Sequence, residues 1–418
     1  MSIMTTVCGS GLLGLLHPPE DGHLKGLVDL VATVAHLPKV IAFGSCHSLP
    51  LATESTEQLW DAVRALDPSI FVWTGDVVYA DHRKHAYLPF VWTPSEIERV
   101  RETYKQMEGY APYAAAMEGR LVLGMGDDHD LNCNNGDKTC AADPLVKEAL
   151  LRLLGETEAN SPRWQREGLY ASYLFREASS GESHSVILLD TRSFRVAGGG
   201  ELLGERQWMW LERQLQVPAS VVVLVSSVQV LPPDKPLSEG WIHHPLCRLR
   251  LLEMLRRLAS STPSNRRVVL VSGDIHSAEL LWDNCSLSSP LLEVTSSGMT
   301  HSIGRQFVID AARSRLTAFN YPNHNFGSMA FDWTRRVLSV RIHDSSGHVV
   351  GAASDLSFSP EPAICNHPLA LHREAPFIYL VMIVCALAAL VFLIWLFPCF
   401  LRYRRGAKKE YSIKKHDF

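Results

Sequence analysis

The sequence predicts an α/β protein followed by one C-terminal transmembrane helix. Three observations lead to this prediction: short apolar runs recur along the chain, helix-like segments separate them, and a long uncharged stretch lies near the end. The chain has 418 residues, of which 46% are hydrophobic, so it is long enough to bury a sizeable core.

The apolar runs are rich in Val, Ile and Leu and have the length of buried strands. They lie at residues 40–43, 70–73, 121–123, 186–189, 221–225 and 268–271. The helix-like segments, at 56–66, 95–107, 204–215 and 245–258, have acidic or small residues near their starts. Residues 326–350 contain an alternation of apolar and polar side chains that predicts a late β-hairpin.

The uncharged stretch at 377–401 is 25 residues long, and about 20 apolar residues suffice to cross a bilayer. A buried core helix is the alternative, but such helices are usually shorter and rarely apolar on every side. We therefore expect a membrane helix that has the lipid bilayer as its partner. Residues 357–376, rich in Pro and polar side chains, are predicted to link it to a folded domain at 37–356.

The tail at 402–418 carries seven Lys and Arg, which predicts that it is cytoplasmic and that the body is lumenal or extracellular. We expect a single-pass protein of the secretory pathway, in the endoplasmic reticulum or at the cell surface. This topology needs an export signal within residues 1–36, where only a short apolar region without a preceding Lys or Arg is found. The alternative is a tail-anchored protein with a cytosolic body.

Cysteine and charge give two further indications. Cys133 and Cys140 lie in a polar loop, where they either pair in an oxidising compartment or remain free thiols. The net charge is −4 and the tail contributes +5, so the rest of the chain carries −9. Such an acidic body argues against a nucleic-acid scaffold as partner, because phosphate backbones are bound by clustered Lys and Arg.

Four of the predicted strands end in polar clusters rich in chemistry-bearing residues. The clusters are GSCH at 44–47, TGDVVYAD at 74–81, GDDHD at 126–130 and SGDIHSAE at 272–279. Ligands in open α/β sheets gather beyond the carboxyl ends of the strands, so these clusters are expected to form a site.

Each cluster also has an interpretation without function. A lone Cys46 after a strand is more often a small buried hydrophobe, and Gly-Asp before Val77 marks a turn as often as a site. A solvated turn or a structural Asp–His hydrogen bond could explain the other two clusters. However, adjacent carboxylates at 126–130 would repel one another if buried without cations, and Asp274 and His276 share one face of an extended segment.

Taken together, carboxylates, imidazole, phenolate and thiolate suit a site for two metal ions such as iron, calcium, manganese or magnesium. Two such ions polarise a phosphoryl group and lower the pKa of a water molecule to give hydroxide. A histidine beside the ions can protonate the leaving oxygen. The acidic body is then explained, because the ions supply the positive charge that a phosphate substrate needs.

In their order and spacing, the motifs resemble those of the PhoD-like alkaline phosphatase D family, within the calcineurin-like metallophosphoesterases. The resemblance covers about residues 40–350. It rests on FGSC at 43–46, TGDVVY at 74–79, GDDHD at 126–130 followed by Asn134, LDTR at 189–192, GERQWMWL at 204–211, SSVQVLP at 226–232, EGW at 239–241, SGDIH at 272–276 and TSSGMTH at 295–301.

The resemblance implies a sandwich of two mixed β-sheets flanked by helices, with metals between the strand-end loops. It implies two or more metal ions, Fe³⁺ and Ca²⁺ first, with Mn²⁺, Mg²⁺ and Zn²⁺ as alternatives. Asp76 would bridge the metals and Tyr79 would bind ferric iron. The full implied ligand set is Cys46, Asp76, Tyr79, Asp128, Asp274 and His276.

The remaining implied residues have other roles. His129 would be the catalytic acid, while Asn134, His301 and Asp127 would contact a metal or the phosphate. The sequence departs from the family where Gly126 replaces a frequent Trp and Ala80 replaces a common acid.

The expected function is a metal-dependent phosphoric ester hydrolase, a phosphomonoesterase or phosphodiesterase that acts by metal-bound hydroxide on a phosphate-ester substrate. The alternative is a membrane-tethered binding or adaptor protein built on an inactive phosphoesterase fold. Loss of several ligands would be the mark of the alternative.

Overall fold

The structure is a computed structural model that describes residues 15–19, 28–83, 92–140, 143–158, 161–233, 235, 239–260, 266–304, 314, 316–362, 364–365 and 387. The chain divides into two compact units, residues 1–372 and 373–418. The membrane span predicted at 377–401, apart from Leu387, and the basic tail lie outside the described residues, as does the start of the chain up to residue 14. Among the helices that are described, none is both long and apolar enough to cross a bilayer.

The first sheet of the body contains eight strands within the described residues and mixes parallel and antiparallel pairs. Four successive strands, β8, β9, β10 and β12, run parallel, with Val269 of β10 opposite Val223 of β9. In spatial order the strands are β1 (Leu30–Val34), β7 (Ala171–Glu177), β8 (Ser183–Leu189), β9 (Val221–Ser226), β10 (Arg267–Ser272), β12 (Leu291–Ser296), β11 (Ala278–Asp283) and β13 (Thr317–Tyr321).

The second sheet contains six strands in the same part of the chain. Strands β2, β3 and β6 are parallel, and an antiparallel hairpin series pairs with β2. In order they are β16 (Val349–Ser357), β15 (Val337–Asp344), β14 (Asn325–Asp332), β2 (Val40–Gly44), β3 (Ile70–Thr74) and β6 (Leu121–Met125). A small antiparallel pair, β4 (His82–Arg83) and β5 (Trp92–Thr93), completes the strands.

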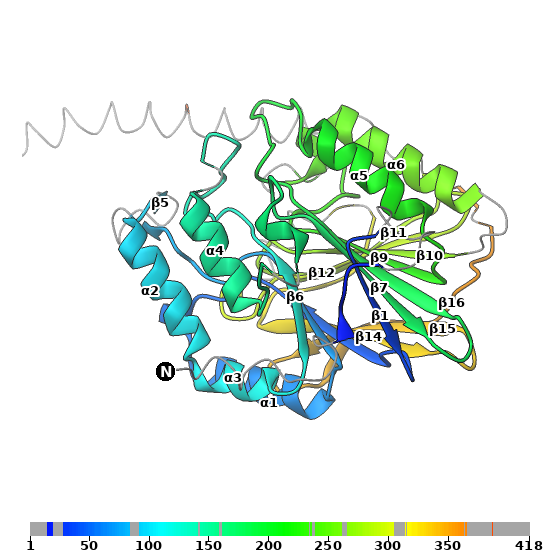
Figure 1. The fold of residues 1–418 in the computed structure, drawn as a ribbon, viewed down its shortest axis with the longest axis horizontal. Coiled ribbons are helices and arrows are strands. Elements are labelled where there is room, and N and C mark those ends of the chain that lie inside the picture. The colour runs from blue at the N-terminus through cyan, green and yellow to red at the C-terminus, as the bar shows by residue number, and fades with distance from the viewer. Residues whose placement is uncertain are drawn as a thin grey trace, which may run out of the picture. The chain divides into compact units, whose positions relative to one another are not determined.

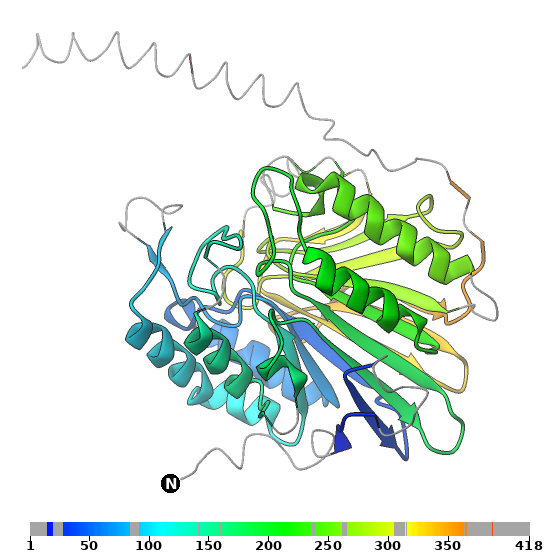
Figure 2. The same ribbon diagram turned by 45° about the horizontal axis from the view of Figure 1, so that its top comes forward.

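The two sheets pack face to face, and helices cover the outer face of each. One core cluster fills the space between the sheets, with Phe43 and Val72 from one sheet and Val223 and Val271 from the other. Helices α5 (Gly204–Gln216) and α6 (Pro245–Ser260) bury their apolar sides on the first sheet. Helices α1 (Glu54–Leu66), α2 (Ile97–Glu108), α3 (Ala111–Met117) and α4 (Pro144–Leu153) cover the second (Figures 1 and 2).

Local sequence explains why these segments form these elements. Helix α1 begins with a capping box between Thr53 and Thr56, and it buries Leu59, Trp60 and Val63 at helical spacing. Strands β3, β6, β9 and β10 are buried along their whole length, as expected for parallel strands that are covered on both faces. Short 3-10 helices occur at Leu49–Leu51, Pro162–Trp164 and Trp241–His243.

The structure confirms the predicted sandwich of two mixed sheets flanked by helices. Each of the six predicted strands and four predicted helices has an observed counterpart, and the late hairpin is β14 and β15, with β16 added. The sheet begins at Leu30, before the predicted domain boundary at 37, because β1 pairs with β7. The disulfide Cys285–Cys365 attaches the start of the predicted linker to the body.

Candidate metal centre

The carboxyl ends of parallel strands from both sheets meet at one place in the body. The backbone N–H of His47 after β2 donates to the carbonyl of Asp76 after β3 (2.9 Å). The residues after β10, in the first sheet, lie equally close to the ends of β2 and β3 in the second sheet. A Cβ on Gly273 would lie 2.6 Å from the Oγ of Ser45 and 2.8 Å from the carbonyl oxygen of Thr74. Only a glycine therefore lets the two sheets come together at this point.

Four predicted metal ligands have a left-handed backbone. Their φ values are 60° for Cys46, 48° for Asp76, 72° for Asp274 and 56° for His276. This conformation is uncommon outside glycine, and such strained residues cluster at functional sites. These four residues follow β2, β3 and β10, where the ligand atoms of the predicted site come together.

Five of the six predicted ligands, all but Tyr79, form three overlapping groups together with His129 and Asp127, and within each group the ligand atoms lie within 4.8 Å of one another. Asp76 belongs to the first two groups and Asp128 to the last two, so the groups form one continuous band. The groups are Cys46 with Asp76 and His276, Asp76 with Asp128 and His129, and Asp127 with Asp128 and Asp274.

Cys46 is fully buried at one end of this band. Its Sγ lies 3.4 Å from Oδ2 of Asp76 and 3.0 Å from Oγ of Ser297. Burial raises the pKa of the Cys46 thiol to about 12, with Asp274 adding to the shift. The thiol therefore keeps its proton near neutral pH unless a cation binds to the sulfur.

Tyr79 joins two histidines beside Cys46. Its hydroxyl lies 3.2 Å from Nε2 of His276 and 3.0 Å from Nδ1 of His301. The two imidazoles stack with ring centroids 4.1 Å apart. Burial, together with Cys46 and Asp76, raises the pKa of Tyr79, so its phenol also needs a cation to ionise.

Asp128 differs from the other buried acids because it is held as a carboxylate. It accepts hydrogen bonds from the backbone N–H groups of Asn135 (2.6 Å) and His129 (2.9 Å). Burial by itself raises its pKa, but Arg192 and His129 outweigh burial and lower it to about 2. Asp128 is thus a preformed anionic ligand in the centre of the band.

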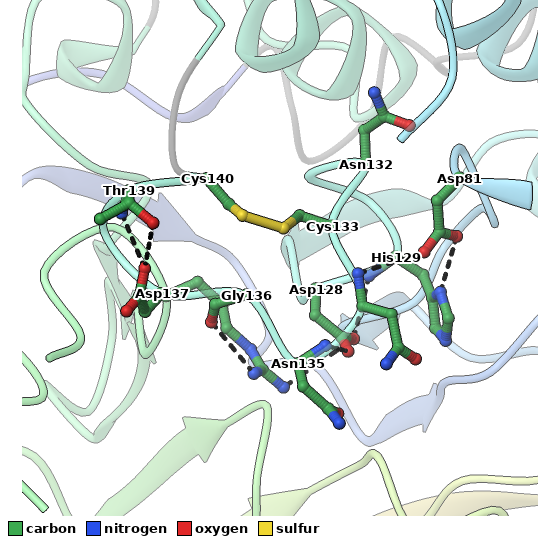
Figure 3. The surroundings of a disulfide bond; sticks show 12 residues. Asp81, Asp128, His129, Asn132, Cys133, Asn135, Gly136, Asp137, Thr139 and Cys140 are labelled. Atoms are coloured by element: carbon green, nitrogen blue, oxygen red, sulfur yellow. Dashed lines mark hydrogen bonds and ion pairs between the residues drawn. A yellow bond between two sulfur atoms is a disulfide. The ribbon is translucent and has the colours of Figure 1, made fainter. Parts of the chain in front are cut away.

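His129 has a fixed orientation. Its Nδ1 lies 2.7 Å from Oδ1 of the buried Asp81 (Figure 3), and its ring stacks on Tyr79 with centroids 4.0 Å apart. Burial lowers the pKa of His129, but Asp128 and the hydrogen bond to Asp81 outweigh it and leave the pKa raised. Because Asp81 occupies Nδ1, Nε2 is the nitrogen that can meet a substrate.

Asp127 and Asp274 form the other end of the band. Asp127 Oδ1 accepts hydrogen bonds from Nε of Arg192 and from Oγ of Ser227 (2.7 Å). Arg192 also pairs with Glu239 through Nη1 (2.8 Å). Burial, with Glu239 and Asp127, raises the pKa of Asp274 well above its ordinary value.

The residues present fit metal ions. Oδ1 of Asp76 and Oδ2 of Asp127 are buried and have no hydrogen-bond partner among the described residues. A buried carboxylate oxygen without a partner is costly, and here several acids share one guanidinium, that of Arg192. Cations bound by these oxygens, the thiol sulfur and the imidazoles would supply both the missing contacts and the missing charge.

The structure thus gathers nearly all of the predicted site residues. The side chain of His301 contacts the centre through the hydroxyl of Tyr79, whereas Asp127 is itself a member of the band, beside Asp128 and Asp274. The backbone N–H of Asn134 donates to Oδ2 of Asp81 (3.2 Å), and the expected contact of its side chain with a metal or the phosphate stays a prediction.

Sequence reasoning missed Asp81, Arg192, Ser227, Ser297 and Glu239. Asp81 ends the polar run after β3, and the other four lie inside the motifs quoted from the family resemblance, but no role was assigned to any of them. A polar residue directly after a buried strand was the signal available for Ser227 and Ser297.

Two solved structures have a similar fold. "Structure of PhoD" aligns with a TM-score of 0.58 over 82% of this chain and 76% of the other, with 15% identity. "GAP50 the anchor in the inner membrane complex of Plasmodium" aligns with a TM-score of 0.52 over 79% of this chain and 91% of the other, with 13% identity. No protein-family model matches the sequence, and none of the curated proteins is similar to it. The likeness to PhoD confirms, at the level of the fold, the resemblance that the motifs predicted.

Proposed function

On this PhoD-like fold, we propose that the chain is a metal-dependent phosphoric ester hydrolase. The single observation that carries the proposal is the continuous band of ligand atoms from Cys46 to Asp274. The band consists of three overlapping groups, and the ligand atoms within each group lie within 4.8 Å of one another. Strained backbone at four of its members supports a functional site, since a purely structural cluster does not need such conformations.

The proposed ligands divide between the two ends of the band. Cys46, Tyr79 and His276 would hold one cation, for which Fe³⁺ is favoured by the thiol and phenol. Asp128 and Asp274 would hold the other through hard oxygens suited to Ca²⁺, Mn²⁺ or Mg²⁺, and Asp76 would contact both. When bound, the cations supply positive charge to the phosphoryl group and activate water as the nucleophile.

His129 would donate the proton to the leaving oxygen of the ester. Asp81 holds Nδ1 and thereby leaves Nε2 to face the band, and the raised pKa of His129 favours the protonated imidazole that an acid needs. The ring is also fixed by stacking on Tyr79 and by an edge contact with Trp92, 4.5 Å between centroids. Proton donation therefore requires no rearrangement of the side chain.

The test is a hydrolysis assay with the full chain purified in detergent. We expect release of nitrophenol from mono- or bis-nitrophenyl phosphate when Fe³⁺ is combined with Ca²⁺, Mn²⁺, Mg²⁺ or Zn²⁺. We also expect the iron-loaded protein to be coloured, because a phenolate on ferric iron absorbs visible light, and Tyr79→Phe to bleach it. Absence of hydrolysis with every metal combination would contradict the proposed activity.

A second candidate is an anchor or adaptor on an inactive phosphoesterase fold, which the likeness to the Plasmodium anchor favours. The intact ligand band argues against it, because an inactive fold has no need to keep buried, mutually repelling acids. Elemental analysis separates the two. Stoichiometric metal supports the hydrolase, and a metal-free, inactive but folded protein supports the anchor.

The proposal includes the location of the body. The disulfides Cys133–Cys140 and Cys285–Cys365 support an oxidising compartment, and the predicted span at 377–401 would tether the body to its membrane. Asn284 is exposed and starts an N-glycosylation sequon. In cells, glycosidase treatment should shift the mobility of the wild type but not of Asn284→Gln. Digestion of the body by protease added to the cytosolic side of the membrane would exclude this topology.

A further inference from the structure

The segment after β6 carries the candidate metal ligand Asp128 and the candidate acid His129, and a loop with a disulfide follows them. Residues 131–140 contain turns but no helix or strand, and Cys133 is bonded to Cys140 within them. Asp128 and His129 lie directly before this loop. Figure 3 shows the disulfide beside Asp128 and His129. Cys133 is half-buried and Cys140 is exposed.

Two backbone amides inside the disulfide ring point at buried carboxylates of the candidate centre. The N–H of Asn135 donates to Oδ2 of Asp128 (2.6 Å), and the N–H of Asn134 donates to Oδ2 of Asp81 (3.2 Å). Asp128 is a candidate metal ligand, and Asp81 holds the imidazole of His129. One short ring therefore orients both carboxylates, and each bond comes from the main chain, so its geometry depends on the loop conformation alone.

The ring is folded tightly against the disulfide itself. The N–H of Gly136 donates to the carbonyl of Cys133 (2.8 Å), and a Cβ at position 136 would lie 2.6 Å from that oxygen and 3.2 Å from the Cys133 sulfur. Just before the ring, Asn132 is tied to the backbone of Ser95 by bonds of 2.7 and 2.8 Å. Inside the ring, the Lys138 N–H donates to the carbonyl of Arg195 (2.9 Å). The N–H of Cys133 also donates to the carbonyl of Asp128 (2.9 Å), and the S–S bond adds a covalent restraint on residues 134 and 135 to these hydrogen bonds.

We propose that the Cys133–Cys140 disulfide is a positioning element: it holds the backbone amides of Asn134 and Asn135 in hydrogen-bonding position to Asp81 and Asp128. The metal centre is then fully assembled only after this disulfide has formed. The expected effect on metal binding rests on the proposed function. The restraint of the two amides by the disulfide is independent of that function. Partners that orient metal ligands are worth about 10- to 100-fold in metal affinity or activity, which sets the expected size of the effect.

The test compares two double variants of the full chain. Cys133→Ser with Cys140→Ser removes the loop disulfide. Cys285→Ser with Cys365→Ser is the matched control, because Cys285 follows the end of β11 that is distant from His276. Hydrogen exchange at the Asn134 and Asn135 amides measures the restraint, and Mn²⁺ titration of the metal-free protein measures its consequence.

We expect the loop variant to exchange these amides faster and to bind Mn²⁺ about tenfold more weakly, with the control unchanged in both. Unchanged exchange, or faster exchange with unchanged Mn²⁺ affinity, would overturn the inference, as would equal effects in the control. If even the wild type binds no Mn²⁺, the proposed function fails, and the exchange measurement alone decides the inference.

A second variant guards against loss of folding in the serine variants. Gly136→Ala keeps both cysteines but places a methyl group against the Cys133 carbonyl. We expect the same faster exchange and weaker Mn²⁺ binding, to a smaller degree. As its control, Gly109→Ala replaces a glycine with a φ of −82°, where the added Cβ would lie no closer than 3.5 Å to its nearest neighbour, the carbonyl oxygen of Lys105, and it should leave both measurements unchanged. Equal behaviour of the two glycine variants would contradict a special role of the ring.

Discussion

At the scale of single residues, the candidate centre sets buried acids close together and relies on external charge to balance them. Asp76 shows this most clearly. It is fully buried, one of its oxygens has no partner among the described residues, and burial with the charges of Cys46 and Asp128 raises its pKa well above the usual value. Residues chosen for binding or catalysis commonly reduce stability in this way.

The first prediction concerns Asp76→Asn. In the metal-free protein at pH 7, we expect the amide to stabilise the fold, because a raised pKa of the carboxyl means that its ionised form is destabilising in the native state. The same variant should lose metal binding. Denaturant unfolding with and without Mn²⁺ checks both effects. A variant that is less stable than the metal-free wild type would contradict this account.

The second prediction concerns His129→Gln. If His129 is the acid, the variant should keep its metal content and lose roughly 100- to 10,000-fold in kcat. The wild type should lose activity as pH rises through the raised pKa of His129, and the variant should lack this alkaline decline. Elemental analysis and pH profiles measure these changes. Loss of metal instead would show that His129 is a ligand, as its place in the group with Asp76 and Asp128 allows.

At the scale of elements, the connections between helices and strands are held by buried polar contacts as well as by apolar packing. The clearest case is the segment between α4 and β7. Arg163 of the 3-10 helix and Glu156 are both buried and lie 2.7 Å apart, and the Tyr173 hydroxyl of β7 donates to the same Glu156 oxygen (2.8 Å). This network joins the helical layer to the first sheet.

The third prediction follows from that network. Replacing Arg163 by Met should destabilise the fold by about 3–5 kcal/mol, since it leaves the buried Glu156 carboxylate without its cation. The control is Arg206→Met, whose partner Glu167 is exposed, as Arg206 itself is. The control should cost less than about 1 kcal/mol. Urea unfolding compares the two variants, and similar losses would show that burial does not set the cost.

At the scale of the whole molecule, the space between the sheets is apolar apart from a few groups, and one of them titrates. His184 of β8 is fully buried and lies against Phe175 and Phe331, at centroid distances of 4.9 and 5.3 Å, so it contacts both sheets. Neither of its ring nitrogens has a hydrogen-bond partner among the described residues. Burial lowers the pKa of His184 to about 3.

The fourth prediction is a pH dependence of stability. Because the folded-state pKa of His184 lies below the unfolded value of 6.5, the unfolded chain gains a proton first as pH falls, and stability is lost between about pH 6.5 and pH 3. His184→Leu should reduce the slope by about 1.4 kcal/mol per pH unit in that window. The exposed His36 serves as control, and His36→Leu should leave the slope unchanged. An unaltered slope in His184→Leu would refute the assignment.

Much of the fold could be predicted because its signals are local. Runs of Val, Ile and Leu mark β9 and β10, and helical spacing of apolar residues marks α1 and α5, whatever the rest of the chain does. Strands with more polar sequences were missed. Examples are β7, with a Ser, a Tyr and an Arg, and β13, which is only half-buried.

For the site, the sequence by itself determined which residue types are available and that they follow buried strands. It could not determine which side chains contact one another in the site. The contact of Cys46 with Ser297 joins residues 251 positions apart, and that of Asp127 with Arg192 joins residues 65 apart. Such pairs exist only once two sheets have packed and their strand ends have met. Hydrophobic period is a property of neighbouring residues, whereas the charge balance of a buried site is a property of the whole fold.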